Sequence, residues 1–318
     1  MSRTRRIGTW VQVLLSVLAF GYIAWRLQQF HNWEVFGRQL QQNTGGLVLL
    51  LLLQVLLAAL NIALESLKWQ QLKGGLLHQS FGSTLRQVLK GLQSGLVTPA
   101  RAGDPFMKAW LLPRGLRTQA FLRSLAGSFL QNMVLMAGGF VGLLWLQSGG
   151  LPEELADFGR ELLRWTTLAL VLVLVLALLL VAFWPRLRTR PQWRQQVQAL
   201  GQLGRGRLGR GRLLKVMALT LLRYATYHLQ LWLILHHLGV LQHWSDLALV
   251  MLYYAALTLL PTMALTDLGI RGSIALFLFG LRSANSPAIV GAIFLIWCLN
   301  LALPALLSAV LPPRRPPE

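Results

Sequence analysis

The stretch TPARAGDP, residues 98–105, interrupts an otherwise apolar part of the chain. It places two prolines, an arginine and an aspartate within eight residues. The flanking segments, GLQSGLV at 91–97 and FMKAWLL at 106–112, are rich in apolar residues and helix formers. Proline lacks an amide proton and restricts the residue before it, so the stretch predicts a break between two short helices. Where this break lies relative to a membrane decides the fold.

The composition places the chain in a lipid bilayer. Of 318 residues, 55% are hydrophobic and only 13% are charged, and a soluble domain of this size would expose much of that apolar surface to water. An apolar run of about 20 residues crosses a hydrocarbon core of about 30 Å at about 1.5 Å per residue. Six such runs predict six full spans: 7–25, 47–64, 118–146, 162–184, 213–238 and 286–311.

The positions of the basic residues orient these spans. Segment 185–215 contains nine arginines and lysines and no acid, which predicts a cytoplasmic loop. Directly between two spans, these bases are expected to contact anionic lipid headgroups rather than nucleic acid. Arginines near both ends of the chain place both termini on the same side. We therefore expect a protein of a bacterial-type inner membrane with cytoplasmic termini, and a disordered tail at 312–318.

Two apolar regions, 81–113 and 246–281, remain after the spans are counted. The first must begin and end inside and the second must begin and end outside. Each is either two full crossings, joined by a turn among the headgroups, or one re-entrant hairpin. The arms 106–113 and 268–281 offer about 12 Å and about 21 Å of helix, less than the core thickness of about 30 Å. These lengths favour two hairpins inserted from opposite sides, whose irregular tips need cover from protein or a water-filled cavity.

The breaks in the two regions contain the same residue types. Each combines proline, glycine, aspartate and arginine: Pro99, Arg101, Gly103 and Asp104 in the first, and Pro261, Asp267, Gly269 and Arg271 in the second. Paired broken segments in the two halves of a chain are typical of inverted-repeat transporters, with a site near the membrane midplane. We expect the tips to approach each other, with coincidence as the alternative. The aspartates are expected to pair with the arginine of their own tip or of the opposite one.

Further polar residues lie within the predicted membrane segments. Arg86, Lys90 and Gln93 fall within about 60° on a helical wheel and predict a polar stripe leading to the first tip. For Arg86, snorkelling to the headgroups is the alternative. Arg223 and Tyr227 share a helix face, and Arg223 lies roughly 12 Å from Lys215 along the helix, where a charge usually faces a cavity or a partner.

Two more polar groups have competing interpretations. Gln131 and Asn132, in the middle of a span, either line a path or form interhelical hydrogen bonds. Asn61, Glu65 and Lys68 follow one another at helical spacing at the end of the second span, and we expect an interfacial cluster at the inner surface.

No motif indicates catalysis. The sequence lacks a nucleophile elbow, a phosphate-binding loop and an HExxH helix. The only cysteine is Cys298, and no histidine has acidic or cysteine neighbours at metal-ligand spacing. We therefore expect a protein that is not an enzyme and that needs neither metal nor cofactor.

Several of these residues resemble motifs of the lysylphosphatidylglycerol synthase transmembrane-region family. Proteins of this kind are the flippase-like membrane part of aminoacyl-phospholipid synthases and also occur as stand-alone polytopic proteins. The resemblance rests on Leu67-Lys68-Trp69, on Pro99 to Asp104 followed by Lys108, and on Pro261 through Gly269-Ile270-Arg271. The family motifs are similar to P-x-R-x-G-E, with a base four positions on, and P-x-x-x-G-G-x-G-V-R-E.

The chain departs from this pattern at its charged positions. Asp104 replaces a glutamate, Lys108 an arginine, and Gly272 a glutamate. Neutral residues stand where the family has an E-R-x-x-D cluster: Ser128, Gln131 and Asn132. No aminoacyl-transfer domain follows Glu318, so the resemblance implies the translocase-like half alone.

The sequence thus predicts an all-α polytopic membrane bundle of six spans and two oppositely inserted re-entrant hairpins. We expect the tips to bind or pass an anionic or aminoacylated headgroup of an amphiphile, a phospholipid or a polyprenyl-phosphate lipid. Arg101, Lys108 and Arg271 would meet phosphate, because arginine bonds phosphate with two donors, and Asp104 and Asp267 would balance their charge.

Two other functions remain open at the level of sequence. One is a membrane scaffold for a separate lipid-modifying or glycosyl-transferring enzyme, in which case the basic loop would be the sensitive element. The other is an ion-coupled transporter of a small anion. Membrane lipids with anionic headgroups are the expected partners, and the oligomeric state is not indicated.

Overall fold

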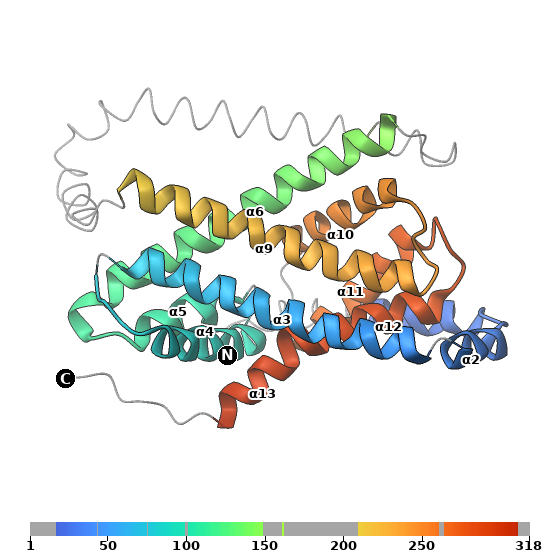
Figure 1. Cartoon of the computed structure of the whole chain (residues 1–318), viewed down its shortest axis with the longest axis horizontal. Helices are drawn as coiled ribbons and strands as arrows, with labels where there is room; N and C mark the ends of the chain where they lie inside the picture. The colour runs from blue at the N-terminus through green and yellow to red at the C-terminus, as the bar shows by residue number, and fades with distance from the viewer. Residues whose placement is uncertain are drawn as a thin grey trace, which may run out of the picture.

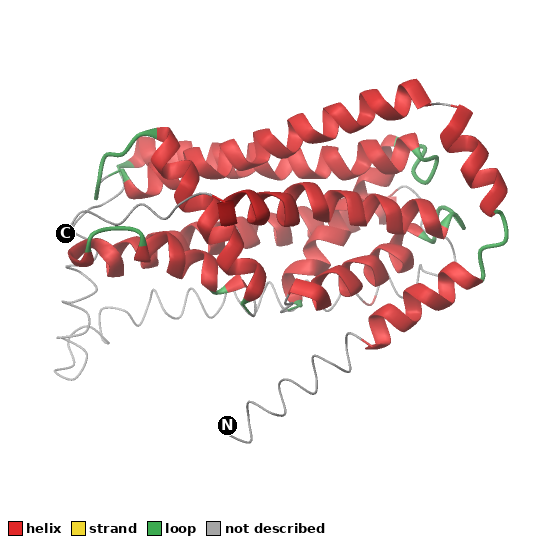
Figure 2. Cartoon of the chain, turned by 90° about the horizontal axis from the view of Figure 1, so that it is seen from below, coloured by secondary structure: helices red, strands yellow, loops and turns green. Residues whose placement is uncertain are grey.

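Every regular element in the described part of the chain is helical, as predicted. The computed structural model describes residues 17–42, 44–74, 76–98, 101–148, 161, 209–260 and 264–310. An N-terminal helix is described over residues 17–28. The other elements (Figures 1 and 2) are α2 (Trp33–Gln42), α3 (Thr44–Lys73), α4 (Phe81–Val97), α5 (Gly103–Trp110), η2 (Arg114–Leu116), α6 (Arg117–Ser148), α9 (Arg210–His237), η3 (Trp244–Asp246), α10 (Leu247–Leu259), α11 (Ala264–Phe279), α12 (Ser286–Trp297), η4 (Cys298–Ala302) and α13 (Leu303–Val310). The predicted span 162–184, most of the loop 185–215 and the tail 312–318 lie outside the described residues.

Three helical stretches among the described residues are long and apolar enough to cross a membrane. They contain 30, 33 and 25 residues and cover three of the predicted spans: Thr44–Lys73, Arg114–Leu146 and Ser286–Val310. Helix α9 covers the predicted span 213–238 with 28 residues, about 42 Å of helix. It is more polar than the other three because it carries Arg210, Arg212, Lys215 and Arg223.

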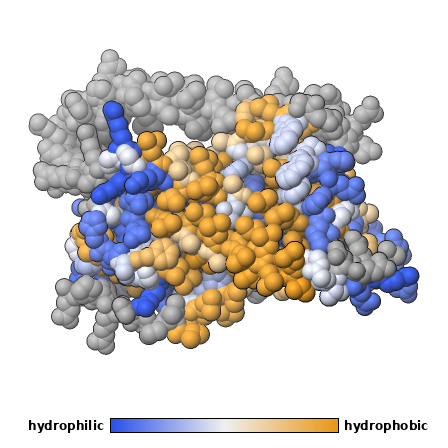
Figure 3. All heavy atoms as spheres, in the orientation of Figure 1, coloured by the Kyte–Doolittle hydropathy of each residue, from blue (hydrophilic) through white to orange (hydrophobic). Residues whose placement is uncertain are grey.

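Helix α3 shows why this bundle belongs in a bilayer. Leu49, Leu52 and Leu56 are 69%, 59% and 66% exposed. The same helix buries its polar residues: Gln54, Asn61, Glu65, Ser66 and Lys68. In water the opposite arrangement is stable, because water solvates charges and excludes hydrocarbon. On the face that Figure 3 shows, apolar side chains cover the middle of the molecule and polar residues lie toward both ends.

The two predicted hairpin regions consist of short helices. Helices α4 and α5 contain 17 and 8 residues, and α10 and α11 contain 13 and 16. Helix α5 begins three residues earlier than the predicted arm at 106–113 and also ends earlier. Pro105 is compatible with the first turn of a helix, whereas Pro113 disfavours helical backbone at the preceding residue.

Glycines allow the closest helix contacts. A Cβ at Gly91 of α4 would overlap the Asp104 carboxylate and lie 3.1 Å from Lys108 Cγ, so α5 packs against the bare backbone of α4. Helices α6 and α10 approach in the same way at Gly142, where a Cβ would lie 2.8 Å from the Ala248 carbonyl oxygen. Small residues commonly form such contacts in membrane bundles.

The last two α-helices, α12 and α13, together contact both hairpin regions. Helix α12 packs against α11 and α9, and α13 packs against α4. Between them η4 is a π-helix, in which the Leu303 amide donates to the Cys298 carbonyl oxygen. Pro304 follows and has no amide proton for the next helical hydrogen bond. Single π-turns of this kind are frequent at functional sites.

Candidate functional site

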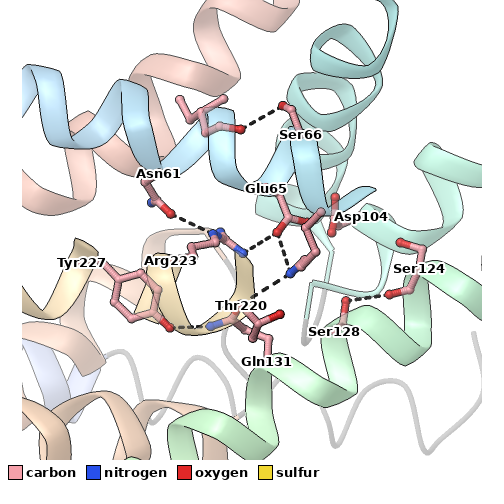
Figure 4. Close-up of polar contacts among 12 residues, drawn as sticks. Asn61, Glu65, Ser66, Asp104, Ser124, Ser128, Gln131, Thr220, Arg223 and Tyr227 are labelled. Atoms are coloured by element: carbon pink, nitrogen blue, oxygen red, sulfur yellow. Dashed lines mark hydrogen bonds and ion pairs between the residues drawn. The ribbon is translucent and has the colours of Figure 1, made fainter. Parts of the chain in front are cut away.

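One buried carboxylate, that of Glu65 in α3, contacts three cations. Glu65 Oε2 lies 2.7 Å from Lys68 Nζ and 2.6 Å from Arg223 Nη1 of α9. Glu65 Oε1 lies 2.7 Å from Lys108 Nζ of α5. Figure 4 shows Arg223 and Glu65 directed toward each other. Lys108 Nζ also lies 2.9 Å from Asp104 Oδ2. We call these five residues the Glu65 cluster. Because breaking a buried ionic group leaves an uncompensated charge, the cluster holds α3, α5 and α9 together.

A second ionic group joins the two hairpin regions. Arg271 Nε lies 2.7 Å from Asp267 Oδ2, one turn earlier in α11. Arg101 Nη2, from the first break, lies 3.9 Å from the same oxygen. We call these three residues the tip group. Of the pairs expected within each tip, Asp267 with Arg271 is present, whereas Asp104 pairs with Lys108 instead of Arg101.

The backbone of the first break is unusual at Arg101. Its φ is 55°, in the left-handed region that residues with a Cβ avoid. The turn is fixed by Thr98 Oγ1, which accepts a hydrogen bond of 2.8 Å from the Gly103 amide. A Cβ at Gly103 would lie 2.5 Å from the Ser94 carbonyl oxygen, so only glycine fits. Strain of this kind persists where the surroundings enforce it, often at functional sites. Outside the described residues lie Pro99, Ala100 and Pro261.

A chain of side-chain amides runs from Arg223 to the last helix. Arg223 Nε donates to Asn61 Oδ1 at 2.8 Å, and Asn61 Nδ2 donates to Asn300 Oδ1 at 2.8 Å. Asn300 Nδ2 donates to Gln230 Oε1 at 2.9 Å, and Gln230 Nε2 donates to the Gln54 carbonyl oxygen at 3.1 Å. Because arginine only donates, it fixes the direction of every bond in the chain. Asn300, from the π-helix, thereby orients Asn61 toward Arg223.

The charges of the two groups do not cancel. The Glu65 cluster and the tip group contain five basic side chains, Lys68, Arg101, Lys108, Arg223 and Arg271, against three acidic ones, Glu65, Asp104 and Asp267. The Arg101 side chain is 42% exposed, whereas that of Asp267 is 5% exposed. This arrangement has a formal excess of two positive charges and can bind an anion such as phosphate, for which arginine offers paired donors.

Residues 10–308 match the family described as the lysylphosphatidylglycerol synthase TM region. The chain belongs to this family. The resemblance predicted from the motifs is thereby confirmed, and the family places the chain among membrane proteins of lipid-related function. No curated protein and no solved structure has significant similarity to the chain.

One departure from the family motif has a structural explanation. Gly272, which replaces a glutamate, faces the N-terminal helix, where a Cβ would lie 2.7 Å from Ile23 Cδ1. Gly269 contacts the same helix, and Ser273 Oγ donates to the Ala19 carbonyl oxygen at 2.9 Å. A long side chain at position 272 would displace the N-terminal helix from α11.

The predicted polar stripe on α4 does not lead to the first tip. Lys90 Nζ donates to the Ser308 carbonyl oxygen at 2.6 Å, and Ser308 Oγ donates to Gln93 Oε1 at 3.0 Å. These contacts attach α4 to α13 instead. Arg86 lies one turn before Lys90 and is half-buried.

Only one of the two neighbouring amides in α6 faces the Glu65 cluster. Gln131 Nε2 donates to Tyr227 Oη at 2.7 Å, and Lys68 Nζ donates to Gln131 Oε1 at 3.5 Å. Asn132 is exposed on the outer face of the helix, because consecutive helical residues point about 100° apart. Asn132 is therefore not part of the site.

The central role of Glu65 was not predicted. From their spacing at the end of the predicted span, Asn61, Glu65 and Lys68 were expected at the membrane surface, yet all three are buried. Glu65 lies eight residues before the end of α3 at Lys73, about 12 Å along the helix. The recurrence of Gln54, Asn61, Glu65 and Lys68 at intervals of seven, four and three is a helical face and was the available signal.

Proposed function

We propose that this chain binds the headgroup of a phosphate-bearing lipid at the tip group and the Glu65 cluster and passes it across the membrane. The observation that supports this most directly is the ion pair between Arg101 and Asp267, which joins two helix breaks beside a buried charged cluster. Charges inside a membrane bundle are costly and usually mark a substrate pathway. The family's relation to lipids favours an amphiphile, a phospholipid or a polyprenyl-phosphate lipid, as the substrate.

In this proposal the two pairs of short helices are re-entrant hairpins inserted from opposite sides. Helix α5 is about 12 Å long and α10 about 20 Å, each short of a core of about 30 Å. Irregular backbone at mid-membrane needs cover, which each tip would give to the other. Six full spans complete the topology, and the positive-inside rule places both termini and the basic loop on the cytoplasmic side of a bacterial-type inner membrane.

The arginines of the tip group would contact the phosphate. Arg101 is the most exposed of the cations, at 42%, and its distance of 3.9 Å to Asp267 is long for an ion pair. Arg271 would add a second donor, and Asp267 would balance both arginines when no lipid is bound. Lys108, which the sequence analysis also placed at the phosphate, contacts both Glu65 and Asp104 and is buried. We assign Lys108 to holding α5 in place.

The test is lipid movement in vesicles that contain the purified full chain. A phospholipid with a fluorophore on its acyl chain is followed by quenching from outside the vesicle. We expect Arg101→Ala and Arg271→Ala to slow movement at least about tenfold, the effect of about 1.4 kcal/mol of lost headgroup binding. Arg38→Ala is the control, because Arg38 pairs with Glu34 at the surface, outside the site, where both side chains are exposed, and its rate should equal that of the wild type.

Unchanged rates in both tip variants would contradict the proposal. Loss of a partner protein on neutralising the basic loop, with normal tip variants, would instead favour a scaffold. Uptake of a labelled small anion without lipid movement would favour an ion-coupled transporter. Membrane lipids are the proposed partners, and the proposed function involves no covalent step.

A further inference from the structure

We infer that the site accepts an anionic lipid headgroup and rejects one that carries a cationic amine. This inference rests on the proposed function and narrows its substrate class to phosphate diesters without a compensating amine. A headgroup that carries an ammonium group is disfavoured, and most strongly one whose net charge is positive, such as an ester of lysine.

Every carboxylate described in the site already contacts a cation. Glu65 contacts three ammonium or guanidinium groups, at 2.6 to 2.7 Å. Asp104 contacts Lys108 at 2.9 Å, and Asp267 contacts Arg271 at 2.7 Å. A bound ammonium group needs a carboxylate or several neutral acceptors inside a membrane, because its desolvation is otherwise uncompensated. To contact the Glu65 or Asp267 carboxylate, an amine would have to displace a cation already in place. Asp104 Oδ1 has no hydrogen-bond partner but is buried, beside the Lys108 ammonium group that Oδ2 contacts.

The accessible charge in the site is also positive. Arg101, Arg223 and Arg271 have side chains that are 42%, 19% and 18% exposed. The Glu65, Asp104 and Asp267 carboxylates are 9%, 18% and 5% exposed. Arg101 is therefore more exposed than any carboxylate of the site, and an entering headgroup meets its guanidinium group first. Repulsion between like charges is strong where water is scarce, so a cationic headgroup is disfavoured at its first contact.

The helix that borders the Glu65 cluster on its remaining side adds no acid. Helix α6 contributes neutral side chains there, among them Ser124, Ser128 and Gln131 (Figure 4). Ser128 Oγ donates to the Ser124 carbonyl oxygen at 3.2 Å, and Gln131 donates to Tyr227. The excess of two positive charges is thus left for a ligand to neutralise. A phosphate diester reduces this excess by one, whereas the lysyl ester of phosphatidylglycerol, with two ammonium groups and one phosphate, would increase it by one.

The deciding experiment compares headgroups in the wild-type chain. Vesicles receive acyl-labelled phosphatidylglycerol, phosphatidylethanolamine or lysyl-phosphatidylglycerol, so that only the headgroup differs. We expect phosphatidylglycerol to move at least about tenfold faster than the lysyl ester, a difference of about 1.4 kcal/mol. The zwitterionic lipid should be intermediate. Equal movement, or faster movement of the lysyl ester, would overturn the inference even if the proposed translocation is correct.

A charge change at α6 provides a second readout. Gln131→Glu is isosteric, places a carboxylate beside Lys68 and removes one positive charge from the excess. We expect it to reduce the preference for phosphatidylglycerol over the lysyl ester several-fold. Gln87→Glu is the matched control, because Gln87 is also buried but contacts Lys73 at 2.8 Å, outside the site. A change of preference in the control, or none in Gln131→Glu, would contradict the inference.

A binding measurement tests the headgroup preference even if the chain does not move lipid across the membrane. If no lipid moves in vesicles, the proposed function fails, and retention of the same three lipids by the detergent-solubilised chain is measured instead. Stronger retention of phosphatidylglycerol supports the anionic preference, and equal retention overturns it. Competition by inorganic phosphate or glycerol phosphate as effective as that by the lipid would show that the site takes free anions, which would overturn the assignment to a lipid.

Discussion

The two hairpin regions have similar breaks but different attachments. The first is tied to the interior: Lys108 contacts both Asp104 and Glu65, and α4 packs directly on α5 through Gly91. The second is tied to the N-terminal helix, which packs on α11 through Gly269 and Gly272. In the described site, Arg101 and Asp267 link the two regions at 3.9 Å, a longer distance than in the ion pairs of the Glu65 cluster.

This difference indicates which contact of the site a bound phosphate can replace. The first hairpin region contributes Asp104 and Lys108 to the buried Glu65 cluster, whereas the ion pair that links the two tips is long, at 3.9 Å. A phosphate that binds Arg101 would compete with Asp267 for the same guanidinium group. Substitutions that loosen the first hairpin therefore test its attachment to the interior. Substitutions of Arg101 alone test the link between the two tips.

The largest effect is expected from Glu65→Gln. The change leaves Lys68, Lys108 and Arg223 without their shared carboxylate, and breaking a buried ionic group costs about 3–5 kcal/mol. We expect a large decrease in the melting temperature of the detergent-solubilised chain. Glu34→Gln is the control, because Glu34 pairs with Arg38 at the surface with 88% of its side chain exposed. A melting temperature equal to that of the control would show that Glu65 does not hold the first hairpin.

A smaller effect is expected from Asn300→Asp. The aspartate still accepts from Asn61 but presents an oxygen to Gln230 Oε1, which lies 2.9 Å from the present amide nitrogen. Loss of one buried donor costs about 1–3 kcal/mol, and we expect lower thermal stability, because two oxygens then face each other between positions 300 and 230. Asn285→Asp at the start of α12 is the control, because Asn285 uses only its oxygen, toward the Ala288 amide. Equal behaviour of the two variants would rule out the directional amide chain.

Gly91→Ala tests the packing of the first hairpin. The new methyl group would overlap the Asp104 carboxylate and press on Lys108, and overpacking of this kind costs about 1–3 kcal/mol. We expect a modest decrease in melting temperature, at the lower end of this range because side-chain atoms can shift. Gly82→Ala, on the same helix with no atom within 4 Å of its Cβ, should be neutral. A neutral Gly91→Ala would mean that α4 and α5 are less closely packed than described.

The local features of this fold could be predicted from the sequence, but the contacts between residues far apart in the chain could not. The breaks near Pro99 and Pro261 were predictable, because proline, glycine and charge stand out in an apolar run. The Glu65 cluster was not, since its partners lie 43 and 158 residues away in the chain. Asn61 and Asn300 are separated by 239 residues. The predicted end of the second span at residue 64 also misplaced Glu65 and Lys68 at the surface, because α3 continues to Lys73.

The smallest effect on stability is expected at Arg101. Two substitutions there should differ in stability but not in lipid movement. Glycine adopts the φ of 55° without the penalty of a Cβ, which is about 1–2 kcal/mol for other residues. Arg101→Gly should therefore be more stable than Arg101→Ala, by up to about 1 kcal/mol after the greater entropy of the unfolded glycine is counted. Both variants lack the guanidinium group and should lose lipid movement equally. The melting temperature and the rate of lipid movement in vesicles are measured for both variants. A glycine variant less stable than the alanine variant would show that the backbone of the first tip is not strained. Full movement in either variant would show that the strained position is occupied by arginine for a reason other than the headgroup.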